Sequence, residues 1–167
     1  MPTVLSLDLG TKMGWALYYE RKDGKYLELS GVNDFSAKRF EGGGMRYLNF
    51  RKWLDVNHGV HSAIDIHEVY FEEVNHSGWR NSSAVYGGFL ATLSCWCEQH
   101  KIPYKGVPVT TIKKFITGKG NANKAAVIKA IQERGYDIKD DNQADAMALS
   151  LYVRNQNDLM KEEDLSF

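Results

Sequence analysis

The chain has 167 residues, of which 43% are hydrophobic and 12% aromatic, which excludes disordered and fibrous proteins and suits one domain with a full core. Its formal net charge is zero, no apolar run approaches the roughly 18 residues of a membrane span, and its start lacks a signal-peptide pattern. Cys95 and Cys97 lie two residues apart in an apolar stretch, so we interpret them as reduced thiols of a cytoplasmic protein without a membrane partner.

The N-terminal part of the chain predicts an antiparallel meander. Residues 3–9 and 14–20 are expected to be apolar strands on either side of a turn that contains Gly10. Asp23-Gly24 is a strong hairpin signal and leads into a third strand over 26–32. Apolar and aromatic residues at helical spacing then predict a helix over about 44–57.

The remainder of the chain alternates strands and helices. The expected elements are a strand over 68–74, a helix from Ser82 or Ser83 to about His100, a short strand over 104–109, a helix over 112–116 capped by Thr110 or Thr111, a helix over about 124–134 and a last helix that opens at 140–145. Pro108 predicts an edge position for the short strand, and Gly87-Gly88 weaken the long helix unless another backbone packs closely there. We expect one domain over residues 1–156, without an internal repeat, and a polar, acidic tail over 157–167.

Acidic residues inside apolar elements are the first candidates for function. Asp8 lies within the first strand, where a lone carboxylate is expensive to bury unless it is paired or bound to a cation. The alternative is a strand-end Asp that bonds to the backbone of the turn. Glu72 and Glu73 end a later strand and face opposite sides, so only one of them can join Asp8, and periodicity does not choose between them.

The start of the last helix carries a further acidic cluster. Asp141 and Asp145 share one face of that helix, as do positions 142 and 145, although Asp141 can also serve as an ordinary N-cap. Carboxylates gathered from distant parts of a chain repel one another unless hard cations lie between them, and Mg²⁺ prefers such oxygen ligands. A two-metal carboxylate site beside a basic surface suits phosphodiester hydrolysis.

A basic stretch can supply that surface. Between Glu98 and Glu133 the sequence holds no acidic residue but seven lysines, namely Lys101, Lys105, Lys113, Lys114, Lys119, Lys124 and Lys129. This local positive charge predicts a surface for a polyanion, and the alternative is a solvated lysine face.

Four groups of motifs carry a family resemblance. They are Leu7-Asp8-Leu9-Gly10-Thr11 with Gly14-Trp15-Ala16, Phe71-Glu72-Glu73-Val74, Ile112-Lys113 with Gly118-Lys119-Gly120-Asn121-Ala122-Asn123-Lys124, and Gln143-Ala144-Asp145-Ala146-Met147-Ala148-Leu149. In this order and at this spacing they resemble the bacterial RuvC Holliday junction resolvase family, within the ribonuclease H-like superfamily. The resemblance covers about residues 3–153.

The resemblance implies an α/β, ribonuclease H-like fold with a five-stranded mixed sheet, antiparallel and then parallel, flanked by helices on both faces. It implies a homodimer that cuts opposing strands of four-way DNA junctions symmetrically, with two Mg²⁺ ions per active site that Mn²⁺ can replace. One ion would activate the attacking water and the other would stabilise the leaving 3′ oxygen, giving 5′-phosphate ends. Such an enzyme is expected in the cytoplasm of a bacterium or, when encoded by a virus, of an infected cell.

The family's catalytic residues carry over by position. Its first Asp falls on Asp8, its Glu on Glu72 and its last catalytic Asp on Asp145. The family's other C-terminal Asp falls on Asn142. The resemblance therefore leaves two candidates for the fourth ligand, the amide oxygen of Asn142 or, by a shift of one residue, Asp141.

The family's basic residues match in part. Lys113 and Lys124 correspond to two family lysines, which implies that they bind backbone phosphates near the cleavage point, with Lys124 also acting in catalysis. We expect Lys114, Lys119 and Arg80 to add contacts to DNA.

One aromatic residue of the family is missing. The position three residues after the family's Glu is Asn75 here, so Trp79 in the same polar loop is our candidate for stacking on unpaired bases. The alternative is a Trp79 ring that packs under its own loop.

Other functions are compatible with parts of this pattern. A broader branched or flap DNA nuclease of the same fold and a non-catalytic nucleic-acid binder are the alternatives that we retain. An actin-like or sugar-kinase ATP-binding domain also begins with Asp-x-Gly-Thr, but it needs a second lobe and about twice the length.

Overall fold

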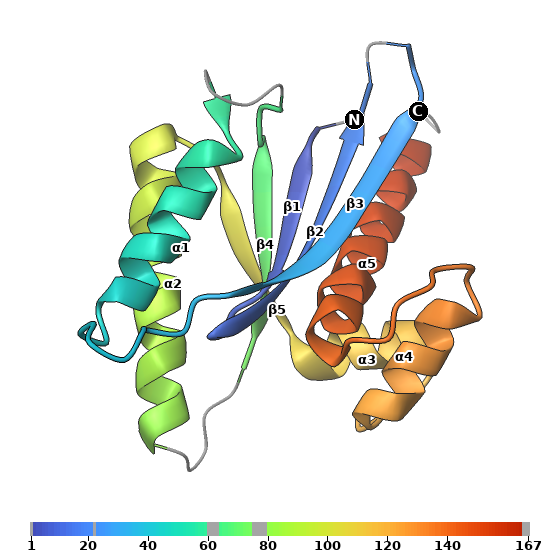
Figure 1. The fold of residues 1–167 in the computed structure, drawn as a ribbon. Helices are drawn as coiled ribbons and strands as arrows, with labels where there is room; N and C mark the ends of the chain where they lie inside the picture. Colours follow the sequence, from blue (N-terminus) through green and yellow to red (C-terminus); the bar gives the residue numbers. More distant parts are fainter. Residues whose placement is uncertain (1, 22, 60–63, 75–79, 165–167) are drawn as a thin grey trace.

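The computed structural model of the protein describes residues 2–21, 23–59, 64–74 and 80–164, with the backbone alone at residues 20, 80–83 and 160–164. The strands are β1 (Val4–Asp8), β2 (Lys12–Glu20), β3 (Tyr26–Asp34), β4 (Glu68–Glu73) and β5 (Tyr104–Pro108). They form a five-stranded sheet in the order β3-β2-β1-β4-β5 (Figure 1). The first three strands are antiparallel neighbours, whereas β4 runs parallel to both β1 and β5. The predicted mixed sheet is therefore confirmed.

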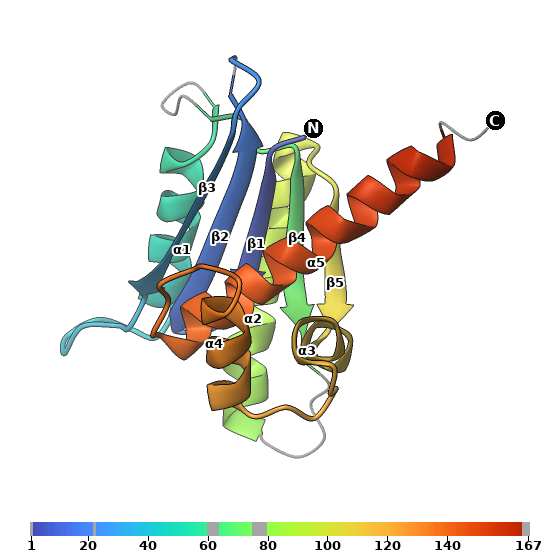
Figure 2. The same cartoon turned by 90° about the vertical axis from the view of Figure 1, so that its right-hand side faces the viewer.

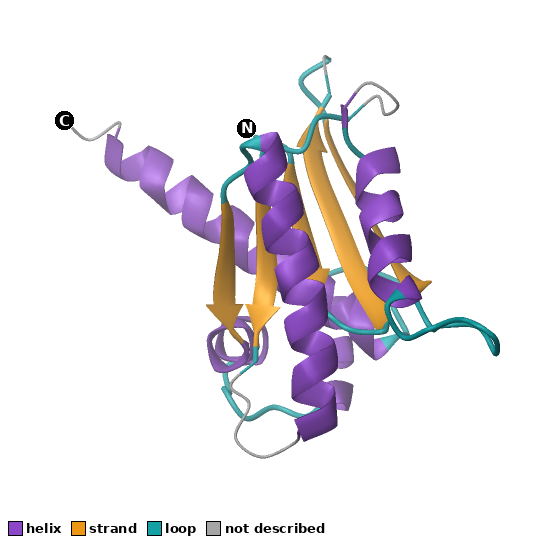
Figure 3. Cartoon of the chain, turned by 90° about the vertical axis from the view of Figure 1, so that its left-hand side faces the viewer, coloured by secondary structure: helices purple, strands orange, loops and turns teal. Residues whose placement is uncertain are grey.

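Helices cover both faces of this sheet. They are α1 (Met45–Val56), α2 (Arg80–His100), α3 (Val109–Thr117), α4 (Lys124–Gln132) and α5 (Asp141–Asp164). The first two lie side by side on one face (Figure 3), while α5 crosses the other face with α3 and α4 near its N-terminal end (Figures 1 and 2). Among the helices of the described residues, none is long and apolar enough to cross a membrane.

Two hydrophobic cores, one on each face of the sheet, follow from the alternation of side chains along the strands. Leu5 and Leu7 of β1 belong to the core under α1 and α2, whereas Val4 belongs to the core under α5. The first core contains the fully buried rings of Phe50, Phe89 and Trp96. The second is built largely from one side of α5, with Ala144, Met147, Ala148, Leu149 and Val153. The sheet is thus fixed from both sides.

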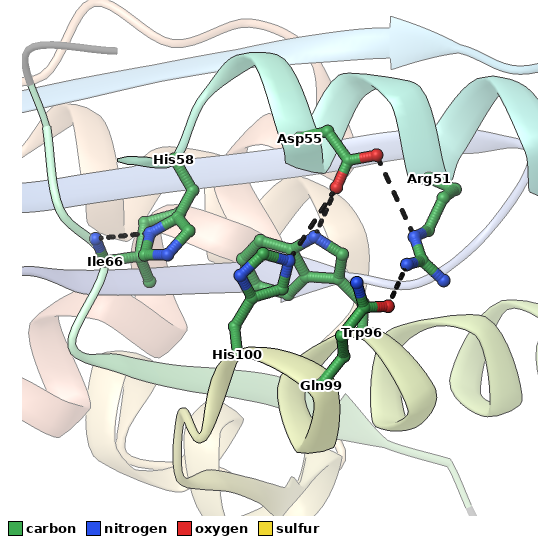
Figure 4. A network of polar contacts seen from close by, with 7 residues as sticks. All are labelled: Arg51, Asp55, His58, Ile66, Trp96, Gln99 and His100. Atoms are coloured by element: carbon green, nitrogen blue, oxygen red, sulfur yellow. Dashed lines mark hydrogen bonds and ion pairs between the residues drawn. The ribbon is translucent and has the colours of Figure 1, made fainter. Parts of the chain in front are cut away.

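A network of polar contacts joins α1 to α2 (Figure 4). The Asp55 carboxylate accepts a hydrogen bond from the indole N–H of Trp96 at 2.8 Å and lies 3.9 Å from both Arg51 and His100. Arg51 also donates to Gln99. Because the Trp96 N–H is satisfied, this ring can be buried completely between the helices and the sheet.

A second network fixes α5 on the sheet. Glu28 of β3 accepts hydrogen bonds from Tyr136 at 2.7 Å, from Ser150 at 3.3 Å and from Arg154 at 3.0 Å. The Arg154 guanidinium also lies 4.3 Å from the centre of the Tyr18 ring, in cation–π geometry. These contacts determine where α5 lies on its face of the sheet.

The start of α3 differs from the prediction. This helix begins at Val109, and no side chain caps its N-terminus, so the prediction of a cap at Thr110 or Thr111 was wrong. Pro108 precedes the helix with φ of −58°, a value that its ring imposes and that suits a helix start. The predicted edge position is confirmed, because Pro108 ends the outermost strand β5.

Two further expectations are modified. Gly88 packs closely against a neighbour, as expected, but this neighbour is the Tyr47 ring of the same chain and not another backbone. A Cβ at Gly88 would collide with that ring. Gly87 has no such neighbour within 4 Å. Residues 157–164, expected to begin a tail, are instead the last turns of α5, which projects beyond the sheet (Figure 2).

Candidate active site

Two acidic residues lie side by side where β1 and β4 end. Leu7 pairs with Phe71 in the parallel register, so the residues that follow them, Asp8 and Glu72, are neighbours. Leu7 and Phe71 face the core under α1 and α2, and alternation therefore directs Asp8 and Glu72 to the α5 face. Glu73 is exposed. The structure thus brings Glu72, and not Glu73, together with Asp8.

A glycine in β2 brings the third acidic residue to this place. Gly14 pairs with Asp8 in the antiparallel register, and a Cβ at Gly14 would collide with the carbonyl group of Asn142. The backbone of the first turn of α5 therefore rests directly on β2. One helical turn further, Asp145 joins the two strand residues.

The three carboxylates form one compact group. One oxygen from each of Asp8, Glu72 and Asp145 lies within 4.8 Å of the other two, and the three side chains are half-buried. Carboxylate oxygens at this spacing are the ligands that hard divalent cations prefer. The cluster is therefore compatible with a divalent metal site.

Burial raises the pKa of all three carboxyl groups, and the charges of neighbouring carboxylates raise those of Asp8 and Asp145 further. For Asp8, burial is the largest cause, followed by the charges of Glu72 and Asp145, and its pKa lies well above the usual value. Burial also raises the pKa of Glu72. Burial and the charge of Glu72 raise the pKa of Asp145 to about 7. Full ionisation of the cluster at neutral pH therefore calls for a cation, and a divalent ion meets that need.

Two predicted lysines face this cluster. Lys113 of α3 and Lys124 of α4 both lower the pKa of Glu72 and of Asp145, and Lys124 also lowers that of Asp8. Their ammonium groups are therefore close enough to attract an anionic ligand to the carboxylates.

The starts of α4 and α5 are joined by an ion pair. Asn123 caps α4 by accepting a hydrogen bond from Ala126 N–H at 2.9 Å, and the next residue, Lys124, pairs with Asp141. The N-cap of α5 is Asp140, whose carboxylate accepts from Gln143 N–H at 3.0 Å. Capping therefore does not occupy Asp141, and its bond to Lys124 lowers the pKa of Asp141.

The other predicted site residues are not part of the carboxylate cluster that the structure describes. Asp141 is not one of the three clustered carboxylates, and Asn142 meets Gly14 through its backbone, so the fourth ligand stays a prediction. Lys114 and Lys119 are exposed on α3 and in the loop after it. Trp79 and Asn75 lie outside the described residues, and Arg80 begins α2 where the backbone alone is described.

Tyr86 of α2 is a contact that the sequence did not suggest. Its hydroxyl donates a hydrogen bond to the carbonyl oxygen of Glu72 at 3.0 Å. This contact holds the end of β4 against α2 and so helps to orient Glu72. No local pattern could have identified it, because Tyr86 resembles the other aromatic residues of an apolar helix.

Solved structures with the same fold identify the architecture. A RuvC structure from Thermus thermophilus matches 92% of this chain and 96% of its own, with a TM-score of 0.68 and 18% identity. The chain has the RuvC fold. The T. thermophilus RuvC structure in complex with a Holliday junction substrate matches 89% of this chain and 90% of its own, with the same TM-score of 0.68 and 18% identity.

A eukaryotic protein shares this fold. The yeast mitochondrial Holliday junction resolvase Ydc2 matches 88% of this chain and 75% of its own, with a TM-score of 0.52 and 15% identity. No protein family and no curated protein matches the sequence itself. The ribonuclease H-like architecture predicted from the motifs is therefore confirmed by the fold.

Gly14→Ala should displace the start of α5 and weaken the site. The added Cβ collides with the Asn142 backbone, which cannot move without the whole helix, so we expect a loss of about 3 kcal/mol in the free energy of unfolding. Affinity for Mg²⁺ or Mn²⁺ should fall too. Urea unfolding and calorimetric titration measure the two effects.

Gly10→Ala is the matched control, because its Cβ would meet only Lys12 O at 3.8 Å, an ordinary contact. Equal stability and equal metal affinity of the two variants would contradict the role assigned to Gly14.

Proposed function

We propose that this protein is an endonuclease that resolves four-way DNA junctions. The observation that carries the proposal is the group of three carboxylates from β1, β4 and α5, with Lys113 and Lys124 beside it, on a RuvC fold. The T. thermophilus RuvC of this fold is known in complex with a Holliday junction substrate, which supports the same substrate class here.

The proposed chemistry is metal-dependent hydrolysis. Asp8, Glu72 and Asp145 would hold two Mg²⁺ ions, or Mn²⁺ in their place, with Asp141 or Asn142 as the fourth ligand. Ions in such a site supply an activated water and stabilise the leaving 3′ oxygen, which gives a 5′-phosphate end. The carboxylates would bind the ions, and Lys113 and Lys124 would hold a backbone phosphate of the DNA beside them.

Substitution of the carboxylates tests this function. Asp8→Asn, Glu72→Gln and Asp145→Asn should each lower the rate of junction cleavage in Mg²⁺ by more than about 100-fold, because loss of even an indirect metal contact costs 10–100-fold. Binding to the junction should persist, since it rests on lysines. Glu73→Gln is the matched control, because this neighbouring side chain is exposed.

The outcomes separate the alternatives. Cleavage by Asp8→Asn at the rate of the parent would rule out the proposed metal site. Equal rates on a flap and on a four-way junction would favour a broader branched-DNA nuclease. Junction binding without cleavage in either Mg²⁺ or Mn²⁺ would favour a non-catalytic DNA binder.

Lysines are proposed to contact the DNA backbone around the site. Lys113→Ala, Lys119→Ala and Lys124→Ala should each weaken junction binding and reduce the slope of log affinity against log salt by about one unit per lost contact. Lys25→Ala, in the exposed turn between β2 and β3, should leave this slope unchanged. An unchanged slope in all three variants would mean that these lysines are only solvated.

A homodimer would place two such sites for symmetric cuts. The support lies on α2, where four small residues at helical spacing are exposed: Ala84, Gly87, Ala91 and Cys95. Such a stripe allows two identical helices to pack closely. Gly87 is open to a partner, whereas Gly88 is occupied by Tyr47 of the same chain.

Cross-linking at Cys95 tests this dimer. Because Cys95 is exposed and Cys97 is fully buried, a short thiol cross-linker should give a covalent dimer of the parent. Cys97→Ser should keep this product and Cys95→Ser should lose it. Sedimentation as a monomer at high concentration with junction bound would exclude the dimer.

A further inference from the structure

Phe40 stands out among the apolar side chains of the described residues. Its ring is 93% exposed, whereas the next most exposed large hydrophobic side chain, Val56, is 65% exposed. A single exposed hydrophobic residue is ordinary in a soluble protein. Three further features bear on Phe40, namely the conformation of its loop, the position of this loop and the charges on it.

The loop presents Phe40 at the corner of an ordered turn. Glu41 N–H donates a hydrogen bond to Lys38 C=O at 3.0 Å, which makes Arg39 and Phe40 the two central residues of a β-turn. The Glu41 carboxylate closes the turn by accepting from Lys38 N–H at 2.9 Å. The ring is therefore held outward by backbone geometry.

The base of this loop is fixed beside the candidate active site. Phe35 N–H donates to Thr11 C=O at 2.8 Å, in the turn that follows Asp8, and the Phe35 ring packs edge-on to Phe50 in the core. The loop leaves the sheet at the end where β1 and β4 finish (Figures 1 and 3). The loop thus starts at the end of the sheet that carries the carboxylates, on the face covered by α1 and α2 (Figure 1).

The charges around the ring favour a nucleic acid as the partner. The Arg39 guanidinium lies 5.4 Å from the centre of the Phe40 ring, and no acidic side chain of the described residues pairs with it. Lys38 adds a second positive charge to this turn, and the Glu41 carboxylate, which accepts from Lys38 N–H, adds a negative one. An exposed ring with an arginine guanidinium beside it fits stacked bases with phosphates nearby.

We propose that Phe40, assisted by Arg39, stacks on unpaired bases at the branch point of the DNA. This inference rests on the proposed function and adds to it a contact that selects branched over linear DNA, since bases unpair more readily at a branch point than within a linear duplex. It gives this chain an aromatic contact from the loop between β3 and α1, whereas Asn75, at the position of the family's aromatic residue, follows β4 in the sequence.

Affinities for branched and linear DNA, measured without divalent metal, test the contact. Phe40→Ala should weaken binding to a four-way junction by about 5- to 150-fold, the range for loss of one stacked base, and leave binding to a linear duplex unchanged. Phe40→Trp should retain junction affinity because it keeps the aromatic face. Val56→Ala, an exposed side chain at the other end of α1, should behave as the parent.

Each contrary result has a defined meaning. Junction affinity of Phe40→Ala equal to that of the parent would overturn the inference and leave the ring for a protein partner. An equal loss on junction and duplex would overturn it too, since base stacking would not be involved. If the parent protein neither binds nor cuts junctions, the proposed function fails. The affinity of the same variants for a single-stranded oligonucleotide then tests base stacking by itself. A loss of affinity of about 5- to 150-fold in Phe40→Ala supports stacking, and no loss overturns it.

Discussion

The approach of α5 to β2 at Gly14 is the constraint on which the rest of the site depends. Three carboxylates that repel one another can be gathered only where rigid elements hold them, and here two strands and one helix do so. Because Gly14 lies opposite Asp8 in the register, the absence of a side chain is needed at the very point where the helix crosses. The two cores and the Glu28 network supply the stability that offsets this repulsion.

The antiparallel meander and the candidate acidic residues could be predicted from local patterns, whereas the five-stranded mixed sheet was implied by the family resemblance. Alternation and turn residues mark the strands, and an Asp within an apolar strand such as Asp8 is unusual enough to indicate a site. The choice between Glu72 and Glu73 could not be made from alternation. Alternation places the two side chains on opposite faces of the sheet but does not show which face also holds Asp8. The family resemblance supplied that choice before the structure did.

Other features depend on contacts between distant residues and leave no local trace. Asp140 and Asp141 are equally good caps by type, and only the position of Lys124 shows that one caps α5 while the other forms an ion pair. The hydrogen bond from Tyr86 to Glu72 is of the same kind. The start of α3 was misplaced because a proline with a suitable φ can open a helix without a capping side chain.

The wide spacing of the clustered acids along the chain has a consequence for biosynthesis. Positions 8, 72 and 145 span most of the 167 residues, and β1 pairs with a strand that follows it by more than 60 positions. Such long-range pairing forms slowly and late. A ribosome-bound chain that still lacks α5 holds only two of the three clustered acids. The group of three carboxylates is therefore completed only after the last helix has left the ribosome.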